Sequence, residues 1–528
     1  MSELGYIPKD LCFDDEARTK LINGITTLSA AVKSTLGPRG QTVLIESTDH
    51  LQGMTVTKDG VTVARSIDLN DAVENLAVRM MKQASEKTAS VAGDGTTTAI
   101  VLTEALVKAG LEHISSDHNK TEVIRFIQEL SEVVIACMEE KSKKITKSRL
   151  LDVATISANN DKELGKIIAS AYNDVGKDGV VTVERSQTDK TYAEVTTGIR
   201  MDRGYSSNLF INSHKKDECI LEDVRVLVCD HEINNVLQIQ TVLEPIIKGG
   251  LKVLIIAPCS TNVVNTLAAN VMRNGLHLCA VPPPSFGFRQ HELMQDIALS
   301  VGAKYFSEKT GDDLSLIHLG DLGHADKVII GKESSVLIKS DQVTEEISAR
   351  IEQLKEQQTA TKNKGERDFI NERIASLAGG IGCIYVGGSS DIEQKEKFDR
   401  VDDAVCAVRS ALQEGILPGG GLALYNEGKV LGDFPISGKN EDAAIAILQH
   451  TLSSPAIQIL DNAGKSAGLI SNGKTYSWGY DVKNECSGDM YEMGIIDPLK
   501  VTKHALRNAV SVATTILSTN AIVTHARA

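Results

Sequence analysis

The order of helix-like and strand-like segments is the feature that most constrains how this chain can fold. Both ends of the sequence are helix-like and punctuated by glycines, whereas strand-like and helix-like segments alternate between residues 224 and 301. Such alternation is typical of an α/β layer with parallel strands. Because the two helical ends share a pattern that the middle lacks, we expect them to form one domain into which the middle is inserted.

Hydrophobic periodicity predicts the main elements of both parts. Helices are expected at residues 14–36, 70–92 and 121–141, and the apolar run 99–107 reads as a buried helix. In the middle of the chain, strands are expected at 224–229, 251–257 and 276–281. Two polar stretches, 154–160 and 477–492, are expected to be loops.

Length and composition agree with several domains built from small aliphatic residues. A single hydrophobic core stops growing at roughly 250–300 residues, so 528 residues predict two or three domains. Aromatic residues make up only 4% of the chain, so the cores must consist mainly of Ala, Val, Ile and Leu. The net charge of −14, with no basic block, argues against nucleic acid as the main partner.

The cysteines and the N-terminal sequence indicate a reducing compartment. Nine cysteines are scattered without a C-x-x-C pair, which favours buried free thiols over disulfides or a zinc site. The first residues contain neither a basic nor an apolar segment, so no signal peptide is expected. No run approaches the roughly 20 apolar residues of a membrane helix. We therefore expect a cytoplasmic protein that has no membrane partner.

A glycine-rich stretch at residues 93–98, Gly-Asp-Gly-Thr-Thr-Thr, is the first candidate binding site. It precedes the helix expected at 99–107, where free N–H groups favour an anion and the glycines allow a close approach of backbone. The threonine hydroxyls add donors for phosphate oxygens. Asp94 would repel a bare phosphate, so its presence makes sense chiefly if Mg²⁺ lies between them. Taken alone, the stretch is explained equally well as an ordinary helix start.

A second glycine run, at residues 419–421, repeats this arrangement in front of another helix-like segment. Bare backbone at a helix start could bind an anion or a ribose, although most such runs are only flexible loops. The chain contains no G-x-x-x-x-G-K-[ST] motif, so a P-loop site is not expected. No G-x-G-x-x-G follows the strand-like segments, so a dinucleotide site is not expected either.

Hydrolysis of a nucleoside triphosphate at these glycines would require a metal, phosphate donors and a carboxylate that orients water. Asp94 would be the metal ligand, and either Asp59 or Asp403 would orient the attacking water. Lys58 is the nearest basic candidate for the phosphates. Each of these residues is weak evidence alone, because single acidic residues usually lie at the surface or cap helices.

Six motifs taken together resemble those of the chaperonins in order and approximate spacing. They are residues 35–40, 57–60, 93–98, 155–159, 419–421 and 494–498. The chain is similar nearly end to end to the group I chaperonins, the GroEL family. The segments 201–205 and 286–289 favour group I over the archaeal and eukaryotic group.

The resemblance implies an α+β multidomain fold with three domains. A mostly helical equatorial ATPase domain would comprise residues 1–139 and 414–528, and a small α/β intermediate domain would comprise 140–197 and 381–413. An inserted α/β apical domain, residues 198–380, would bind polypeptides. The implied function is that of an ATP-dependent chaperone whose seven-membered ring binds and encloses non-native proteins and promotes their folding.

The resemblance also implies roles for individual residues. Asp403 and Asp59 would orient the attacking water, Asp94 would bind Mg²⁺, and a K⁺ ion is expected near Thr35 and Lys58. The residues expected to contact ATP are Thr35, Leu36, Gly37, Pro38, Lys58, Gly93, Asp94, Gly95, Thr96, Thr97, Thr98, Ser157, Gly419, Gly420, Asp481 and Asp497. The residues expected to bind polypeptide are Tyr205, Leu209, Phe210, Val236, Ile239, Leu243, Val264 and Leu267.

The chain departs from the family at two of its binding surfaces. Residues 481–483, Asp-Val-Lys, replace an Asn-Ala-Ala nucleoside contact, which puts the base contact in doubt. Gln240, Ala268 and Ala269 replace larger apolar groups in the apical groove. Burying less apolar area should weaken the capture of unfolded chains, by about 25 cal/mol for each Å² lost.

The positions of the family's usual ring-to-ring ion pairs hold Glu112, Ile457 and Ser466. The sequence therefore does not decide between a single and a double ring, nor whether a co-chaperonin is needed. One alternative is a diverged, virus-encoded or paralogous chaperonin that works as a single ring without a co-chaperonin. Another is a scaffold protein that has kept the fold and lost ATP cycling.

Overall fold

The structure is a computed structural model with mixed helices and sheets. It describes residues 9–46, 54–176, 180–186, 188–213, 217–339, 345–360, 364–378, 380–435, 438–472 and 475–525. The chain forms two compact units. Unit 1 comprises Met1–Ser170, Val183–Tyr192 and Ile384–Ala528, and unit 2 comprises Ala171–Thr182 and Ala193–Cys383. Both ends of the chain thus belong to unit 1, and the division into three domains stays a prediction.

The chain crosses between the units inside regular elements and not at loops. The crossings fall in α7 (Lys162–Val175), β4 (Val180–Arg185), β5 (Tyr192–Met201) and β12 (Gly380–Val386). Each unit has its own hydrophobic core.

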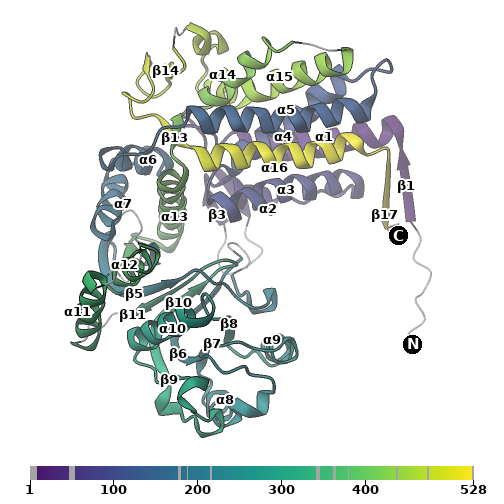
Figure 1. The fold of residues 1–528 in the computed structure, drawn as a ribbon. Helices are drawn as coiled ribbons and strands as arrows, with labels where there is room; N and C mark the ends of the chain where they lie inside the picture. The colour runs from purple at the N-terminus through teal and green to yellow at the C-terminus, as the bar shows by residue number, and fades with distance from the viewer. Residues whose placement is uncertain are drawn as a thin grey trace. The chain divides into compact units, whose positions relative to one another are not determined.

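Long helices form the core of unit 1. They are α1 (Asp14–Lys33), α3 (Ala72–Ala92), α4 (Thr96–His113), α5 (Lys120–Lys141), α15 (Lys439–Asn462) and α16 (Leu499–Ser518). Helix α4 packs against α1, α3, α15 and α16, and Figure 1 shows α3, α16 and α5 running side by side. Ile100, Leu102 and Leu106 of α4 are fully buried. The buried helix predicted at residues 99–107 is therefore confirmed.

Polar residues set where several of these helices begin. Asp71 accepts hydrogen bonds from the N–H groups of Val73 and Glu74 at the start of α3. Asn119 caps α5 in the same way. Side-chain acceptors at these positions satisfy N–H groups that have no partner inside the helix. The helices predicted at 70–92 and 121–141 match α3 and α5 to within two residues.

The described residues of unit 1 also form four two-stranded antiparallel sheets. They are β1 (Lys9–Phe13) with β17 (Ala521–His525), β2 (Val43–Glu46) with β3 (Met54–Thr57), β13 (Ile416–Pro418) with β16 (Ile496–Pro498), and β14 (Trp478–Asp481) with β15 (Cys486–Asp489). Figure 1 shows β1 and β17, near the two ends of the chain, lying side by side. The segment predicted as a loop at 477–492 thus contains a hairpin. Its strands were missed because the alternation of apolar and polar residues in them is too short to stand out in sequence.

Further helices of unit 1 carry the other sequence motifs. They are α2 (Gly60–Ser66), α6 (Leu150–Ser157), α13 (Asp391–Glu414) and α14 (Leu422–Leu431). The polar loop predicted at 154–160 begins inside the last turn of α6, so only its second half is a loop.

A mixed sheet organises unit 2. Its strands follow the order β4, β12, β5, β11 (Ser335–Lys339), β10 (Gly323–Ile330), β6 (Cys219–Cys229), β7 (Lys252–Ile256) and β8 (Leu278–Val281), and β9 (Tyr305–Phe306) also pairs with β6. Strands β6, β7 and β8 are parallel, as the alternating pattern predicted. Strands β5, β11 and β10 are antiparallel, and the sequence reading missed this half of the sheet.

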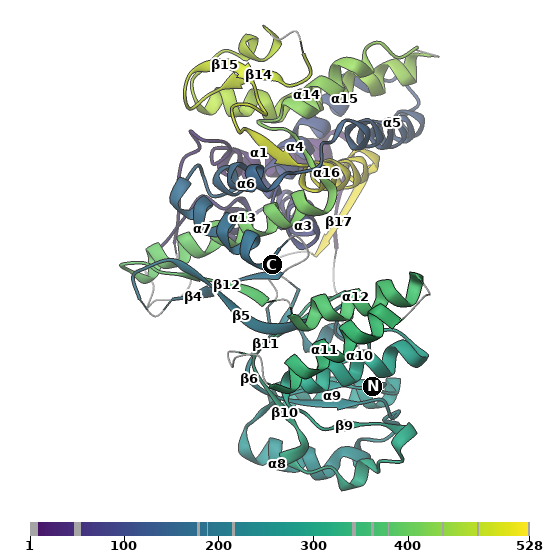
Figure 2. The same cartoon turned by 60° about the vertical axis from the view of Figure 1, so that its left-hand side comes forward.

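Helices cover this sheet. They are α8 (Gln240–Gly249), α9 (Thr261–Asn274), α10 (Gly287–Val301), α11 (Glu345–Ala360) and α12 (Lys364–Ala378). Helix α10 packs on β6 and β10, and α11 and α12 pack against α10 (Figure 2).

Two predictions from composition can be compared with the fold. All nine cysteines are free thiols, as predicted. Among the described helices, α15 is the one whose length and composition would suit a membrane span. It packs against α4, α5 and α14 in the core of unit 1, and this burial accounts for its apolar character.

Candidate functional site

A cavity of about 430 Å³ lies in unit 1 between the N-terminal end of α4, the end of α6, helix α13 and the β14–β15 hairpin. Every residue predicted to contact ATP lines it except Gly93 and Gly419, and both predicted catalytic residues, Asp59 and Asp403, line it as well. Segments separated by hundreds of residues in the sequence therefore meet at one place. Its volume lies within the roughly 300–1,000 Å³ of small-molecule sites.

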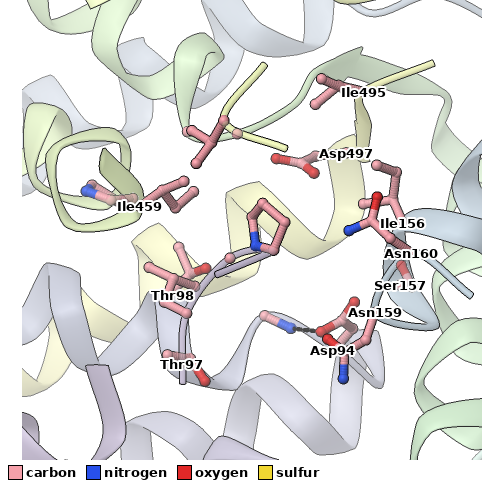
Figure 3. A pocket seen from close by; sticks show the side chains of 18 of the residues that line it. Asp94, Thr97, Thr98, Ile156, Ser157, Asn159, Asn160, Ile459, Ile495 and Asp497 are labelled. Atoms are coloured by element: carbon pink, nitrogen blue, oxygen red, sulfur yellow. Dashed lines mark hydrogen bonds between the residues drawn. The ribbon is translucent and has the colours of Figure 1, made fainter. Parts of the chain in front are cut away.

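Two glycines with a left-handed backbone conformation shape the loop between α3 and α4. Gly93 ends α3 with φ 75°, and Gly95 precedes α4 with φ 82°. A Cβ atom at Gly95 would lie 2.6 Å from a methyl carbon of Val501, so a side chain would not fit there. Asp94 is held between these two turns and lines the cavity together with Thr97 and Thr98 (Figure 3).

The environment of Asp94 suits a bound cation. Its carboxylate accepts hydrogen bonds from the Gly95 N–H and from the Ser157 side chain. Removal from water, together with repulsion by Asp59, nevertheless raises the pKa of Asp94 above its ordinary value. A divalent cation would relieve both effects.

The donor set indicates which cation would fit. Among the described residues, no group of three or more His, Cys, Asp or Glu side chains is arranged to hold a metal. A metal at Asp94 would therefore take its remaining ligands from water and from a bound molecule. Mg²⁺ commonly binds in this way, through one or two carboxylates and the phosphates of a substrate.

Asp59 is fixed as the N-cap of α2. Its carboxylate accepts hydrogen bonds from the N–H groups of Val61 and Thr62, both at 3.1 Å, and from the Thr62 hydroxyl at 2.6 Å. The capping role, which the sequence left as an alternative, is thus real. The same bonds hold the carboxylate rigidly at the wall of the cavity. At the next residue, a Cβ atom on Gly60 would lie 2.2 Å from the Thr97 hydroxyl oxygen, so α2 and α4 approach closely here.

The second glycine run holds another carboxylate. Asp497 accepts hydrogen bonds from the N–H groups of Gly420 and Gly421. Gly421 has φ 73°, and a Cβ atom there would lie 2.7 Å from the backbone nitrogen of Ala456. Gly419 packs against Asp497 and Gly93 packs against Cys406, and neither glycine lines the cavity. Burial, aided by the charge of Asp94, raises the pKa of Asp497 to about 6.

This raised pKa predicts how Asp497 affects stability. Asp497 has a higher pKa in the folded protein (about 6) than the ordinary value of 3.8 expected after unfolding, so the folded state binds the proton more tightly. Its contribution is therefore fully favourable below about pH 4 and is lost as the pH rises to about 6, a loss of about 3 kcal/mol. Urea denaturation should show D497N gaining stability over the wild type across this range.

A carboxylate with the opposite shift provides the control. Hydrogen bonds from the N–H groups of Glu74 and Val73 lower the pKa of Asp71. D71N should therefore lose stability relative to the wild type as the pH rises from about 3 to about 5. If stability depended on pH equally in D497N and in the wild type, the raised pKa assigned to Asp497 would be contradicted.

The end of the cavity beyond Asp497 is apolar. Its walls belong to a small hydrophobic cluster between α14, α15 and the β14–β15 hairpin: Leu422, Ala456, Leu460, Ile470, Val482 and Met490, with Ile459, Tyr480 and Ile495 packed against it. In Figure 3, Ile495 and Asp497 lie on the side of the cavity opposite Asp94 and Thr97. A molecule with an anionic end and a flat apolar end would match both sides of the cavity.

Asp481 has a structural role that the sequence reading did not anticipate. Its carboxylate accepts hydrogen bonds from the N–H groups of Lys483 and Asn484 and from the Asn484 side-chain amide. It therefore holds the turn between β14 and β15, and its side chain is only 5% exposed. Asp481 also lines the cavity, and its contact with ATP stays a prediction.

Lys58 lines the cavity as predicted, but sequence reasoning assigned no site role to its other basic residues. Lys162, Arg400 and Lys483 line it, and the Lys483 ammonium lies 3.5 Å from the carbonyl oxygen of Asn160. Arg400 pairs with Glu396 on α13. The spacing of residues 396, 399, 400 and 403 on one helix was the available signal, because such residues share a face.

The predicted polypeptide-binding residues fall into two groups. Phe210, Ile239, Leu243, Val264 and Leu267 belong to the core of unit 2, each 8% exposed or less. They therefore form no exposed surface in this structure. Their apolar periodicity is the same in a core as in a groove, so the sequence could not separate the two. Leu209 is 48% exposed.

Tyr205 and Val236 are the remaining predicted polypeptide-binding residues. Both are partly buried against the core of unit 2. Of the eight side chains, Leu209 therefore offers the most apolar surface to solvent.

Comparison with known proteins identifies the family of this chain. The model of the TCP-1/cpn60 chaperonin family matches residues 28–527. The chain belongs to this chaperonin family and is of GroEL type. Two crystal structures of the chaperonin gp146 from bacteriophage EL 2 (Pseudomonas aeruginosa), both in the presence of ATP-BeFx, resemble this chaperonin.

The likeness covers almost the whole of both chains. Crystal form II has 25% identity and a TM-score of 0.66, and the match covers 98% of this chain and 99% of that one. Crystal form I has 24% identity and a TM-score of 0.62 with the same coverage. The predicted family and α+β multidomain fold are therefore confirmed.

Proposed function

We propose that this chaperonin is an ATP-dependent molecular chaperone. Its subunits would form a ring that binds and encloses non-native proteins and promotes their folding, driven by ATP binding and hydrolysis. The observation that carries the proposal is the cavity of unit 1, which unites Asp94, the N-terminus of α4 and the carboxylates of Asp59 and Asp403. The relative gp146 was crystallised with an ATP analogue, which supports a nucleotide as the ligand.

We infer one orientation of ATP in the cavity. The phosphates would lie at the N-terminus of α4, where N–H groups and the hydroxyls of residues 96–98 can donate, with Lys58 nearby. Mg²⁺ would bridge Asp94 and the phosphates, and the base would occupy the apolar end. We also propose that a K⁺ ion binds near Thr35. Asp403 and Asp59 would orient the attacking water.

Exposed strand edges in unit 1 support assembly into a ring. The paired strands β1 and β17 expose Leu11 (60%), Phe13 (51%) and Val523 (56%). The paired strands β2 and β3 expose Leu44 (69%) and Met54 (53%). Two-stranded sheets with apolar residues and open edges are stabilised by pairing with another chain. We propose a heptameric ring of identical subunits in the cytoplasm, either single or double.

Exposed apolar side chains in unit 2 support the binding of non-native polypeptides. They include Leu209, Leu237, Met272, Phe286, Phe288 and Leu316. Apolar surface of this kind suits unfolded chains, which expose apolar side chains of their own. A co-chaperonin would compete for the same surface.

Electron microscopy of the purified chain with and without ATP tests this function. We expect closed rings in end views, and a change in their side views when Mg·ATP is added. Stacked pairs in side view would reject the single-ring alternative. A scaffold that has lost ATP cycling would give rings that hydrolyse no ATP, and monomers without ATPase activity would contradict the proposal.

A further inference from the structure

One face of helix α13 connects the cavity to the loop that carries Asp94. Residues 399, 403, 406 and 410 are spaced by four, three and four positions, so they share this face. Asp399 and Asp403 line the cavity. The two residues further along the same face, Cys406 and Ser410, lie outside it and contact the end of α3.

The Ser410 hydroxyl joins α13 to α3. It donates a hydrogen bond of 3.1 Å to the carbonyl oxygen of Ala92, the last residue of α3. Both residues are buried, each only 3% exposed. Carbonyl groups in the last turn of a helix have no partner within it, so Ser410 satisfies an acceptor that would otherwise be costly to bury.

Cys406 packs on the next residue of the loop. A Cβ atom added at Gly93 would lie 2.2 Å from the Cβ atom of Cys406 and 2.7 Å from its sulfur. The backbone of Gly93 therefore touches the Cys406 side chain, and only glycine permits this approach. The loop is thus bound to α13 one residue before Asp94 and one helical turn after Asp403.

We propose that Ser410 and Cys406 are positioning residues that fix the distance between Asp403 and the loop of Asp94. The proposal rests on the ATPase function proposed above. Hydrolysis needs the water-orienting carboxylate and the metal ligand in a defined geometry at the same time. Binding of ATP needs only the loop and the N-terminus of α4. Loss of the contact should therefore slow hydrolysis and spare binding.

Separate contacts hold the C-terminal end of α13 and make the test feasible. Lys503 of α16 pairs with Glu414 at 2.6 Å, and Lys500 donates a hydrogen bond to Gln413. The helix therefore keeps its place against α16 when the Ser410 hydroxyl is removed. A substitution of Ser410 should shift the other end of α13 without unfolding the helix.

The test compares steady-state ATP hydrolysis and ATP binding in S410A and the wild type. The loss of one buried hydrogen bond predicts a fall in kcat of about three- to tenfold. The KM and Kd for ATP should stay within about twofold, because only the geometry of the reacting state changes. C406L, which forces a larger side chain against Gly93, should lower kcat further with the same unchanged Kd.

S131A is the matched control. Ser131 is also 3% exposed, but its hydroxyl donates to Gln128 within α5, away from the cavity. S131A should hydrolyse ATP like the wild type. An unchanged kcat in both S410A and C406L would overturn the proposal, and so would parallel losses of kcat and of ATP-binding stoichiometry, which indicate misfolding. A wild type that neither binds nor hydrolyses ATP would instead overturn the proposed function.

Discussion

Replacement of Asp403 by Asn should abolish ATP hydrolysis while leaving ATP bound. Asp403 lies on the face of α13 that lines the cavity, separate from the α4 N-terminus that would hold the phosphates. Asparagine keeps the size of the side chain but loses the charge that orients and polarises water. Removal of such a group typically costs about a hundredfold to ten-thousandfold in rate. Single-turnover hydrolysis and equilibrium binding of ATP measure the two effects separately.

The neighbouring residue provides a matched control for this variant. Asp402 is on the same helix, has the same side chain, and does not line the cavity. D402N should hydrolyse ATP at a rate within about threefold of the wild type. Normal turnover in D403N would show that another group orients the water, and Asp59 would then be the next candidate.

Replacement of Asp94 by Asn should remove the dependence of ATP binding on Mg²⁺. Asp94 is the carboxylate at the α4 N-terminus, and loss of a direct metal ligand should weaken Mg·ATP binding by at least about a hundredfold. Binding of ATP without metal should change little or improve, because a negative charge next to the phosphates is gone. Calorimetric titration with ATP, in Mg²⁺ and in EDTA, measures both quantities.

Stability supplies an independent readout for the same variant. The pKa of Asp94 is raised in the folded protein, so its ionised form opposes folding at pH 7 when no cation is bound. D94N should therefore be at least as stable as the wild type toward urea in EDTA. A variant that is less stable in EDTA, or that still binds ATP in a Mg²⁺-dependent manner, would contradict the role of Asp94.

The sequence predicted the elements and motifs whose signals are local. Helix α4 followed from a mostly apolar run, and the loop before it followed from two glycines that both adopt positive φ. Strands β6, β7 and β8 followed from alternation with helices. These features depend on residues that are close in sequence, so one chain is enough to detect them.

Features that depend on distant partners were missed. Strands β10 and β11 form a local hairpin with each other, which the sequence analysis overlooked, but their outer partners β6 and β5 lie far away in the sequence, and no local pattern encodes those partners. Leu243 and Val264 have the same periodicity whether they face a core or a groove, and burial decides between the two. The turn that the Asp481 carboxylate holds between β14 and β15 becomes visible only in three dimensions.

The measurement that tests the account most directly is the refolding of a chemically denatured enzyme by the purified chain. Refolding yield should be followed with Mg·ATP, without nucleotide, and with D403N in place of the wild type. We predict that the wild type with Mg·ATP raises the yield of active enzyme above the spontaneous level, and that D403N does not. A yield that is the same with and without ATP, or the same for D403N and the wild type, would contradict an ATP-driven folding cycle.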